Sequence, residues 1–218
     1  MLEQFNLTAE TRQAVAARAS ARTYQVGRAI FTEGDPGEAL GFLLEGKVKL
    51  YRLSAQGREK IIHLLGPGEL LGEIAVLDGG PQPLTVETMD TSQVALINRE
   101  ELHQLRRRCP DLNELLLATA ASRLRTCYRQ ISSLALKSTY GRIAGRLFKL
   151  ARDFGVQTPE GVRLDLALTQ TGLASLVGSS RETVSRTLAD LQNQGILRLS
   201  RSHITILDLK RLRQLGRE

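Results

Sequence analysis

The sequence of 218 residues predicts an α+β protein with an N-terminal β jelly roll, a long helix and a C-terminal winged helix-turn-helix. Three observations predict this order. Short apolar segments separated by glycine-containing turns run from residue 24 to about residue 98. Helix-forming residues dominate residues 99–137, and two short amphipathic segments then follow one another across Gly178. The predicted domains are residues 1–98, 99–137 and 138–218.

The N-terminal part is predicted to be a roll of short strands. Its apolar segments are bounded by turn-forming residues, as at Gly-Asp-Pro-Gly (34–37) and Gly-Pro-Gly (66–68). Many short strands with such turns are typical of a β-sandwich or a jelly roll. The predicted strands are residues 29–31, 39–44, 47–51, 60–65, 84–88 and 93–97.

The middle part is predicted to be helical, with a break at Pro110 and a long helix that opens at Asp111. Two series of apolar residues recur every seven positions in that helix, which is typical of a helix that pairs with another helix. The series are Leu117, Leu124 and Ile131, and Ala120, Cys127 and Leu134. The same residues could instead pack against the chain's own roll, and one helix could do both.

The C-terminal part contains a short amphipathic helix at residues 169–177, whose apolar side is Leu173, Leu176 and Val177. Gly178 then supplies a residue that tolerates positive φ, as a tight turn between two helices needs. Further on, Gly195 ends the second helix, and residues 196–207 are predicted to form a two-stranded wing.

The second helix has a buried stripe and a charged front. Val184, Leu188 and Leu191 recur at helical spacing, and the charged residues Arg181, Glu182 and Arg186 fall elsewhere, in the first turns and on the outward side. Helix, glycine turn and charged second helix form the helix-turn-helix pattern that lies in the major groove of DNA. Arginine pairs with the O6/N7 edge of guanine, and glutamate accepts from the N4 amine of cytosine.

The same residues also allow a purely structural interpretation. Ser179 and Glu182 have the spacing of a capping box, and Glu182 with Arg186 forms an i, i+4 pair on a solvated face. A cap does not explain three charged residues at the exposed front of a second helix after a glycine turn. The sequence therefore favours DNA reading.

The net charge of +7 is unevenly distributed. Residues 1–136 contain 16 Lys+Arg and 16 Asp+Glu, whereas residues 137–218 contain 14 Lys+Arg and 7 Asp+Glu. The whole surplus therefore belongs to the part with the helix-turn-helix. A basic domain attached to a neutral one indicates a polyanionic partner for the basic domain.

Residues 168–188 resemble the DNA-binding element of the cyclic-AMP receptor protein/FNR (CRP/FNR) family of bacterial transcription regulators. Residues 26–35 and 41–50 are similar to that family's cyclic-nucleotide-binding roll, so the likeness covers nearly the whole chain. The resemblance implies a parallel homodimer formed through the long helix, a palindromic site on double-stranded DNA, and activation through contact with RNA polymerase.

Further DNA contacts are expected at the start of both helices and in the wing, where hydroxyl and basic side chains could bind phosphates. Ser180 could equally be only the helix cap. The additional candidates are Ser180, Thr183, Thr169, Arg201 and His203.

The effector pocket of the family is matched only in part. Gly72-Glu73-Ile74-Ala75 matches the segment that, by resemblance, holds the ribose through Glu73 and faces the cyclic phosphate with its backbone amides. The family's next element contains an arginine that neutralises the phosphate. Here Gln82, followed by Pro83, stands in its place.

Two further departures argue against cyclic AMP as the effector. No Lys or Arg lies between Lys60 and Arg99, and Cys127 and Tyr128 stand where the receptor protein contacts adenine, so that Tyr128 would fill the space. Losing one partner of a buried charge pair costs ~2–5 kcal/mol, or roughly 30- to 4,000-fold in affinity. The missing positive charge could instead come from an arginine of the long helix, Arg123 or Arg125.

Other classes of protein fit the sequence less well. A cupin enzyme would need several metal ligands, but the predicted roll has one histidine, His63, and the chain has two cysteines. A roll that regulates a kinase or a channel would not need the charged helix-turn-helix. No apolar run approaches the ~18–20 residues of a membrane span and no signal peptide is evident, so we expect a cytoplasmic regulator without enzymatic activity, metal or certain cofactor.

Overall fold

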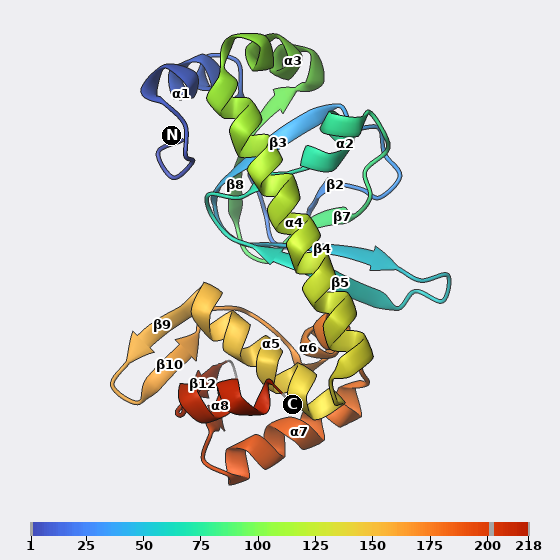
Figure 1. Cartoon of the computed structure of the whole chain (residues 1–218), viewed down its shortest axis with the longest axis vertical. Coiled ribbons are helices and arrows are strands. Elements are labelled where there is room, and N and C mark those ends of the chain that lie inside the picture. Colours follow the sequence, from blue (N-terminus) through green and yellow to red (C-terminus); the bar gives the residue numbers. More distant parts are fainter. Residues whose placement is uncertain (1, 201–202, 218) are drawn as a thin grey trace. The chain divides into compact units, whose positions relative to one another are not determined.

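The computed structural model describes residues 2–200 and 203–217. Contacts divide the chain into two compact units, Met1–Cys127 and Tyr128–Glu218 (Figure 1). The predicted α+β organisation of β roll, long helix and winged helix-turn-helix is confirmed. The predicted domain boundaries stay a prediction, and the long helix α4 (Pro110–Leu136) runs across the division between the units.

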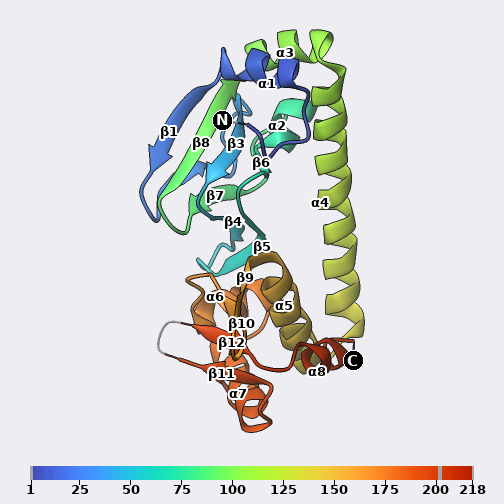
Figure 2. The ribbon, with the colours of Figure 1, turned by 90° about the vertical axis from the view of Figure 1, so that its left-hand side faces the viewer.

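The first unit contains two four-stranded antiparallel sheets, visible in Figure 2. One has the strand order β1-β8-β3-β6 and the other the order β2-β7-β4-β5. The bounds of all six predicted strands lie within two residues of those observed. The strands are β1 (Ser20–Tyr24), β2 (Ala29–Phe31), β3 (Ala39–Glu45), β4 (Val48–Leu53), β5 (Glu59–Leu65), β6 (Leu70–Leu71), β7 (Thr85–Thr88) and β8 (Ser92–Asn98).

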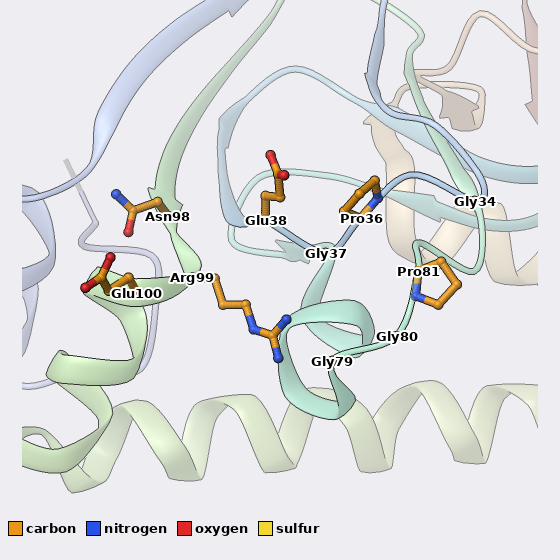
Figure 3. A pocket seen from close by; sticks show the side chains of 10 residues that line it. All are labelled: Gly34, Pro36, Gly37, Glu38, Gly79, Gly80, Pro81, Asn98, Arg99 and Glu100. Atoms are coloured by element: carbon orange, nitrogen blue, oxygen red, sulfur yellow. The ribbon is translucent and has the colours of Figure 1, made fainter.

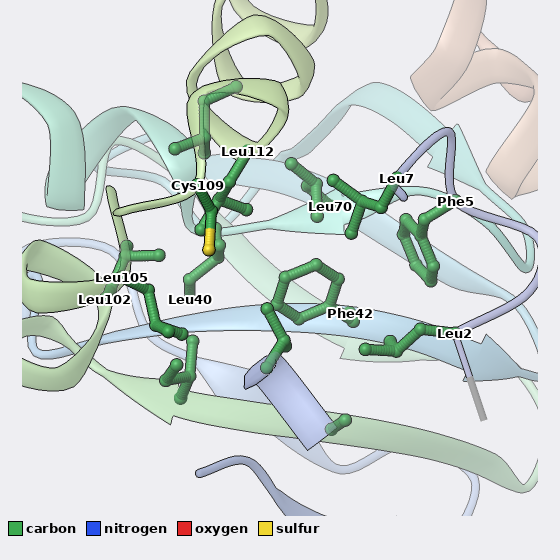
Figure 4. Packing of buried hydrophobic residues seen from close by; sticks show 14 of the residues in the cluster. Leu2, Phe5, Leu7, Leu40, Phe42, Leu70, Leu102, Leu105, Cys109 and Leu112 are labelled. Atoms are coloured by element: carbon green, nitrogen blue, oxygen red, sulfur yellow. The ribbon is translucent and has the colours of Figure 1, made fainter. Parts of the chain in front are cut away.

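Alternating side chains of β4 and β5 are buried, as the two-residue period of a strand allows, whereas five consecutive residues of β3 are buried. In β5, Ile61, His63 and Leu65 are buried while the residues between them are partly exposed. A larger apolar cluster joins β3 to the N-terminal segment and to α3 (Arg99–Arg108) and α4 (Figure 4). Within it, the rings of Phe5 and Phe42 meet edge to face with centroids 5.0 Å apart.

The break between the two central helices lies where Pro110 predicts it. The Asn98 side chain caps α3 by accepting a hydrogen bond from the Glu101 amide at 2.8 Å. The helix α4 begins at Pro110 itself, one residue earlier than expected. The first position of a helix suits proline because an amide there has no partner within the helix.

Several elements carry no clear signal in the sequence and were not predicted. Four of the five residues of β1 are exposed, so the strand lacks the alternation that reveals a half-buried strand. The strand β6 has only two residues. The short helix α2 (Glu73–Asp78), in contrast, begins in the Gly-Glu-Ile-Ala segment that opens a short helix in the family, so the resemblance implied it. The other two unpredicted elements are α1 (Ala9–Ala16) and α8 (Leu209–Leu215).

The second unit combines helices with one four-stranded sheet of order β11-β12-β10-β9. The wing after the helix-turn-helix is found as predicted, and an antiparallel hairpin also precedes the helix-turn-helix. The helix α8 packs closely on α5, since a Cβ on Gly216 would lie 2.6 Å from the Gly145 Cα. The elements are α5 (Thr139–Phe154), β9 (Gly155–Thr158), β10 (Gly161–Leu164), α6 (Gln170–Val177), α7 (Arg181–Asn193), β11 (Leu197–Leu199) and β12 (Ile204–Ile206), followed by α8.

Within residues 2–200 and 203–217, no helix combines the length and the apolar character needed to cross a membrane.

A polar contact ties the N-terminal segment to the first turn of α4. The Asp111 carboxylate accepts hydrogen bonds from the Thr8 amide at 2.8 Å, the Thr8 hydroxyl at 3.0 Å and the Thr11 hydroxyl at 2.6 Å. Desolvation opposes ionisation, but the hydrogen bonds from Thr11 and Thr8 outweigh it and lower the pKa of Asp111 below its ordinary value. The ionised carboxylate therefore stabilises the folded unit.

Replacing Asp111 by alanine should lower the free energy of unfolding by about 1–3 kcal/mol at pH 7, as measured by urea unfolding. Because the pKa of Asp111 is lower in the folded chain, its contribution is present above about pH 5 and is lost as the pH falls. The variant should therefore depend less on pH than the wild type between about pH 5 and 3. Glu114→Ala, at an exposed position of α4, is the control, and equal losses in both variants would contradict the assignment.

Candidate DNA interface and effector site

The turn between α6 and α7 is built on one glycine. Thr169 caps α6 by accepting from the Gly172 amide, and the helix ends at Val177. Gly178 then takes φ 67° and ψ 55°, a left-handed conformation that residues with a Cβ rarely adopt. The amides of Gly178 and Ser179 both donate to the Ala174 carbonyl, at 2.9 and 3.1 Å, and so close the helix. The second helix can therefore start at Arg181, three residues after Gly178.

The cap of α7 is Ser180, and the capping box weighed for Ser179 and Glu182 is not formed. The Ser180 hydroxyl accepts from the Thr183 amide at 3.1 Å and also lies 3.1 Å from the Thr183 hydroxyl. Glu182 is the second residue of the helix. Both hydroxyls of the expected phosphate contacts, Ser180 and Thr183, therefore lie together at the start of α7.

The two sides of α7 differ as the helical spacing predicts. Val184, Leu188 and Leu191 are at most 1% exposed, whereas Arg181, Glu182 and Arg186 are exposed at the front of the helix. Hydrogen bonds from the Glu182 amide and the Ser180 hydroxyl lower the pKa of Glu182 below its ordinary value, and the charges of Arg181 and Arg186 add to this. Glu182 is therefore an ionised acceptor at neutral pH.

The wing strands β11 and β12 pair in antiparallel register, from Leu197 opposite Ile206 to Leu199 opposite Ile204. His203 is exposed in the connection, where its carbonyl accepts from the Ser200 amide at 2.9 Å. Arg201, the other expected wing contact, lies outside the described residues.

Three residues expected in the effector pocket lie close together in the first unit. Gly72 has φ 76° and precedes α2, in which Glu73 is 3% exposed. Gln82 is 2% exposed, and its Nε2 would lie 3.1 Å from a Cβ on Gly72. Among the described residues this Nε2 has no hydrogen-bond partner, although a buried amide donor normally has one.

The other expected pocket residues are less enclosed. Ala75 is buried, but Ile74 is 39% exposed and Pro83 is exposed. Cys127 is partly buried. Tyr128 is 60% exposed, and the expectation that its ring fills the adenine space stays a prediction.

A cation does enter the site, from α4. Arg123 is 9% exposed, and its Nε donates to Glu73 Oε1 at 3.2 Å. Its Nη2 donates to the Leu70 carbonyl at 3.2 Å and lies 3.0 Å from Glu69 Oε2. Of the two arginines considered, Arg125 is exposed. One guanidinium is thus shared by two carboxylates, so the cluster carries a net charge of −1.

A separate open cavity of about 540 Å³ lies in the same unit (Figure 3). The sequence does not reveal this cavity, because its walls come from three segments far apart in the chain and are largely glycine and proline. Its charged side chains are of both signs. The lining residues are Gly34, Pro36, Gly37, Glu38, Gly79, Gly80, Pro81, Asn98, Arg99 and Glu100.

No group of three potential metal-ligating side chains occurs within residues 2–200 and 203–217.

Comparison with known proteins agrees with both halves of this geometry. Residues 21–109 match the cyclic nucleotide-binding domain, and residues 141–215 match the Crp-like helix-turn-helix domain. A CRP-like cAMP-activated global transcriptional regulator of Mycobacterium tuberculosis is 35% identical over 191 residues, which cover 88% of this chain and 85% of that protein. The chain belongs to the CRP/FNR family of transcription regulators.

Other members show the range of the family. A cyclic AMP receptor protein of Thermus thermophilus is 34% identical, with 89% of this chain and 87% of that protein covered. The solved structure of a c-di-GMP-responsive global regulator of Xanthomonas campestris superposes with a TM-score of 0.82 at 26% identity, covering 91% of this chain and 99% of that chain. As a CRP/FNR regulator, the chain is a DNA-binding protein and not an enzyme.

Removing the buried ion pair between Arg123 and Glu73 should destabilise the folded protein. Arg123→Met leaves Glu73 charged and buried, which should lower the free energy of unfolding by about 3–5 kcal/mol. Arg125→Met, on the same helix but exposed, should change it by less than about 0.5 kcal/mol. Urea unfolding of both variants tests this, and Glu73→Gln should recover part of the loss when combined with Arg123→Met. Equal effects of the two arginine substitutions would contradict the pairing.

Proposed function

We propose that this chain is a sequence-specific transcription regulator that binds a palindromic DNA site as a homodimer and does not depend on cyclic AMP. The observation that carries the proposal is the exposed front of α7, where Arg181, Glu182 and Arg186 stand above a buried apolar stripe. These three side chains are free of the core, and their helix is fixed by it. A rigid helix with exposed, charged first turns is suited to the major groove.

Each of the three side chains has a defined partner in this proposal. Arg181 and Arg186 would each grip a guanine through two hydrogen bonds, and the ionised Glu182 would accept from a cytosine amine. Phosphates would be held by the hydroxyls at the helix starts and by the wing, which orient the protein without reading sequence. The proposed phosphate contacts are Ser180, Thr183, Thr169, Arg201 and His203.

The homodimer is proposed from the exposed side of α4. Leu117, Leu124, Ile131 and Leu134 are 71, 52, 63 and 50% exposed, although they are apolar and recur at heptad spacing. An apolar heptad seam on the surface of a monomer is best covered by the same seam of a second copy. A two-fold pair would also present two reading helices, which a palindromic site matches.

Independence of cyclic AMP is proposed from the charges of the effector site. Gln82 supplies no positive charge, and the guanidinium of Arg123 is already paired with the carboxylates of Glu73 and Glu69. A cyclic phosphate would enter a cluster of net negative charge without a counterion, at a cost of ~2–5 kcal/mol. The family resemblance implies an arginine at this position in regulators that bind cyclic AMP, where this chain has Gln82.

An effector-dependent regulator is the alternative, and one observation favours it. The buried Gln82 Nε2 has no partner among the described residues, so it could donate to a small molecule other than cyclic AMP. In either case the family likeness supports activation through RNA polymerase and a place of action on the chromosome, in the cytoplasm.

The deciding experiment is selection of random duplex DNA by the purified full-length protein, with and without cyclic AMP. We expect the same palindromic motif in both, with half-sites about one helical turn apart. Failure to enrich any motif would contradict sequence-specific binding. Enrichment only in the presence of cyclic AMP would contradict nucleotide independence.

Replacing Arg181 or Arg186 by alanine should each cost about 1–3 kcal/mol at the selected site and relax base choice at one position of each half-site. The measurement is binding to the selected site and to all single-base variants of it. Arg163→Ala, which removes an exposed charge from β10 in the same unit, is the control and should leave base choice unchanged. A uniform loss on every sequence would show that the two arginines contact phosphates instead.

Replacing Gln82 by arginine should supply the missing counterion and raise the affinity for cyclic AMP by roughly 30-fold or more. Isothermal titration of the wild type and the variant measures this. Gln82→Leu, which adds no charge, should not gain affinity. Micromolar binding of cyclic AMP by the wild type would contradict the argument from charge.

A further inference from the structure

A chain of polar contacts joins three helices of the second unit and has no part in the function proposed so far. Tyr140 lies in the first turn of α5, two residues after the cap Ser138. Its hydroxyl donates to Asp190 Oδ2 at 2.7 Å. Asp190 belongs to α7, so the contact links residues 50 positions apart in the sequence.

Gln194 and Arg211 complete this series of hydrogen-bonded side chains. We call the four residues Tyr140, Asp190, Gln194 and Arg211 the brace. Gln194 Nε2 donates to the Tyr140 hydroxyl at 3.1 Å and to Asp190 Oδ2 at 2.7 Å. Gln194 Oε1 accepts from Arg211 Nη2 of α8 at 3.1 Å. The Tyr140 hydroxyl therefore both donates and accepts, and every link has a distance of ordinary hydrogen bonds.

Tyr140 has its proton available for this contact. Partial burial and the hydrogen bond to the Asp190 carboxylate raise the pKa of Tyr140 above its ordinary value. A phenol that donates to an ionised carboxylate forms a stronger hydrogen bond than a neutral pair does.

The position of Asp190 on α7 gives the brace its effect. Asp190 follows Arg186 by four residues, so the two side chains lie on the same side of the helix. The core contacts of Val184, Leu188 and Leu191 are apolar and do not depend on direction, so they hold α7 in place without fixing its rotation about its own axis. Rotation of a helix by ~10° moves an atom about 6 Å from its axis by about 1 Å, which is enough to spoil a bidentate contact to a base.

We infer that Tyr140 is a positioning residue for DNA reading, which fixes the rotation of α7 by holding Asp190 through the brace. The inference rests on the proposed function, because it concerns how the reading side chains are aimed. It assigns the brace an effect on discrimination between sequences and none on the attraction of the basic unit to phosphates.

The test compares the palindromic site that the wild type selects with a random duplex of equal length. Tyr140→Phe should weaken binding to the selected site about 3- to 10-fold, and leave binding to random duplex and its salt dependence unchanged. Asp190→Asn changes the charge near DNA, so it is judged by the ratio of the two affinities. The double variant should lower that ratio no further than Tyr140→Phe alone, because both changes remove one contact.

Tyr51→Phe is the matched control. Its hydroxyl donates to Glu87 Oε2 at 3.0 Å in the first unit, so it loses a similar tyrosine–carboxylate bond away from the helix-turn-helix. Tyr51→Phe should leave the ratio of the two DNA affinities unchanged. Only its thermal stability should fall.

An unchanged ratio in Tyr140→Phe would overturn the inference, as would an equal loss on both DNAs. Failure of the wild type to select any site would contradict the proposed function itself and the inference with it. The inference alone would be overturned by a different set of results. In these, the wild type selects a site, Arg186→Ala loses base choice at it, and Tyr140→Phe binds like the wild type.

Discussion

One side of the helix α4 is buried against the roll, and the other side is apolar but exposed. The rest of the molecule depends on both sides. Leu112, Leu116 and Arg123 are buried on one side. Leu117 and Leu124 each directly follow one of these residues in sequence, so they lie ~100° further around the helix and are exposed. The buried side closes the roll and delivers Arg123 to Glu73. The exposed side leaves an apolar seam that a second copy of the chain would cover.

The parts of the fold with local signals were predictable from the sequence. The turn before α7 needs a left-handed residue, and Gly178 supplies it at the position where the apolar spacing restarts. The six predicted strands were predictable because each is a short apolar segment between turn-forming residues. The charged front of α7 was predictable because the stripe of Val184 and Leu188 determines which residues must face outward.

The rest depends on contacts between segments far apart in the sequence. Arg123 and Arg125 carry the same charge on the same helix, and the position of Glu73, 50 residues away, decides between them. Tyr140 and Asp190 give no separate signal of their pairing. The strand β1 was missed because pairing with β8, and not burial, holds its exposed residues in place. Local patterns thus predict elements, whereas long-range polar pairs require the structure.

This difference bears on how the two halves of the chain carry function. In the proposed DNA-binding role, neighbouring residues specify the reading helix, since Arg181, Glu182 and Arg186 all lie within its first six residues. The effector site needs a charge balance assembled from α2, α4 and the loop of Gln82, and one neutral residue in that loop upsets the balance. A buried amide donor without a partner costs about 1–3 kcal/mol. The neutral, buried Gln82 is therefore the residue on which the proposed independence from cyclic AMP depends, whereas the proposed DNA contacts of α7 do not involve it.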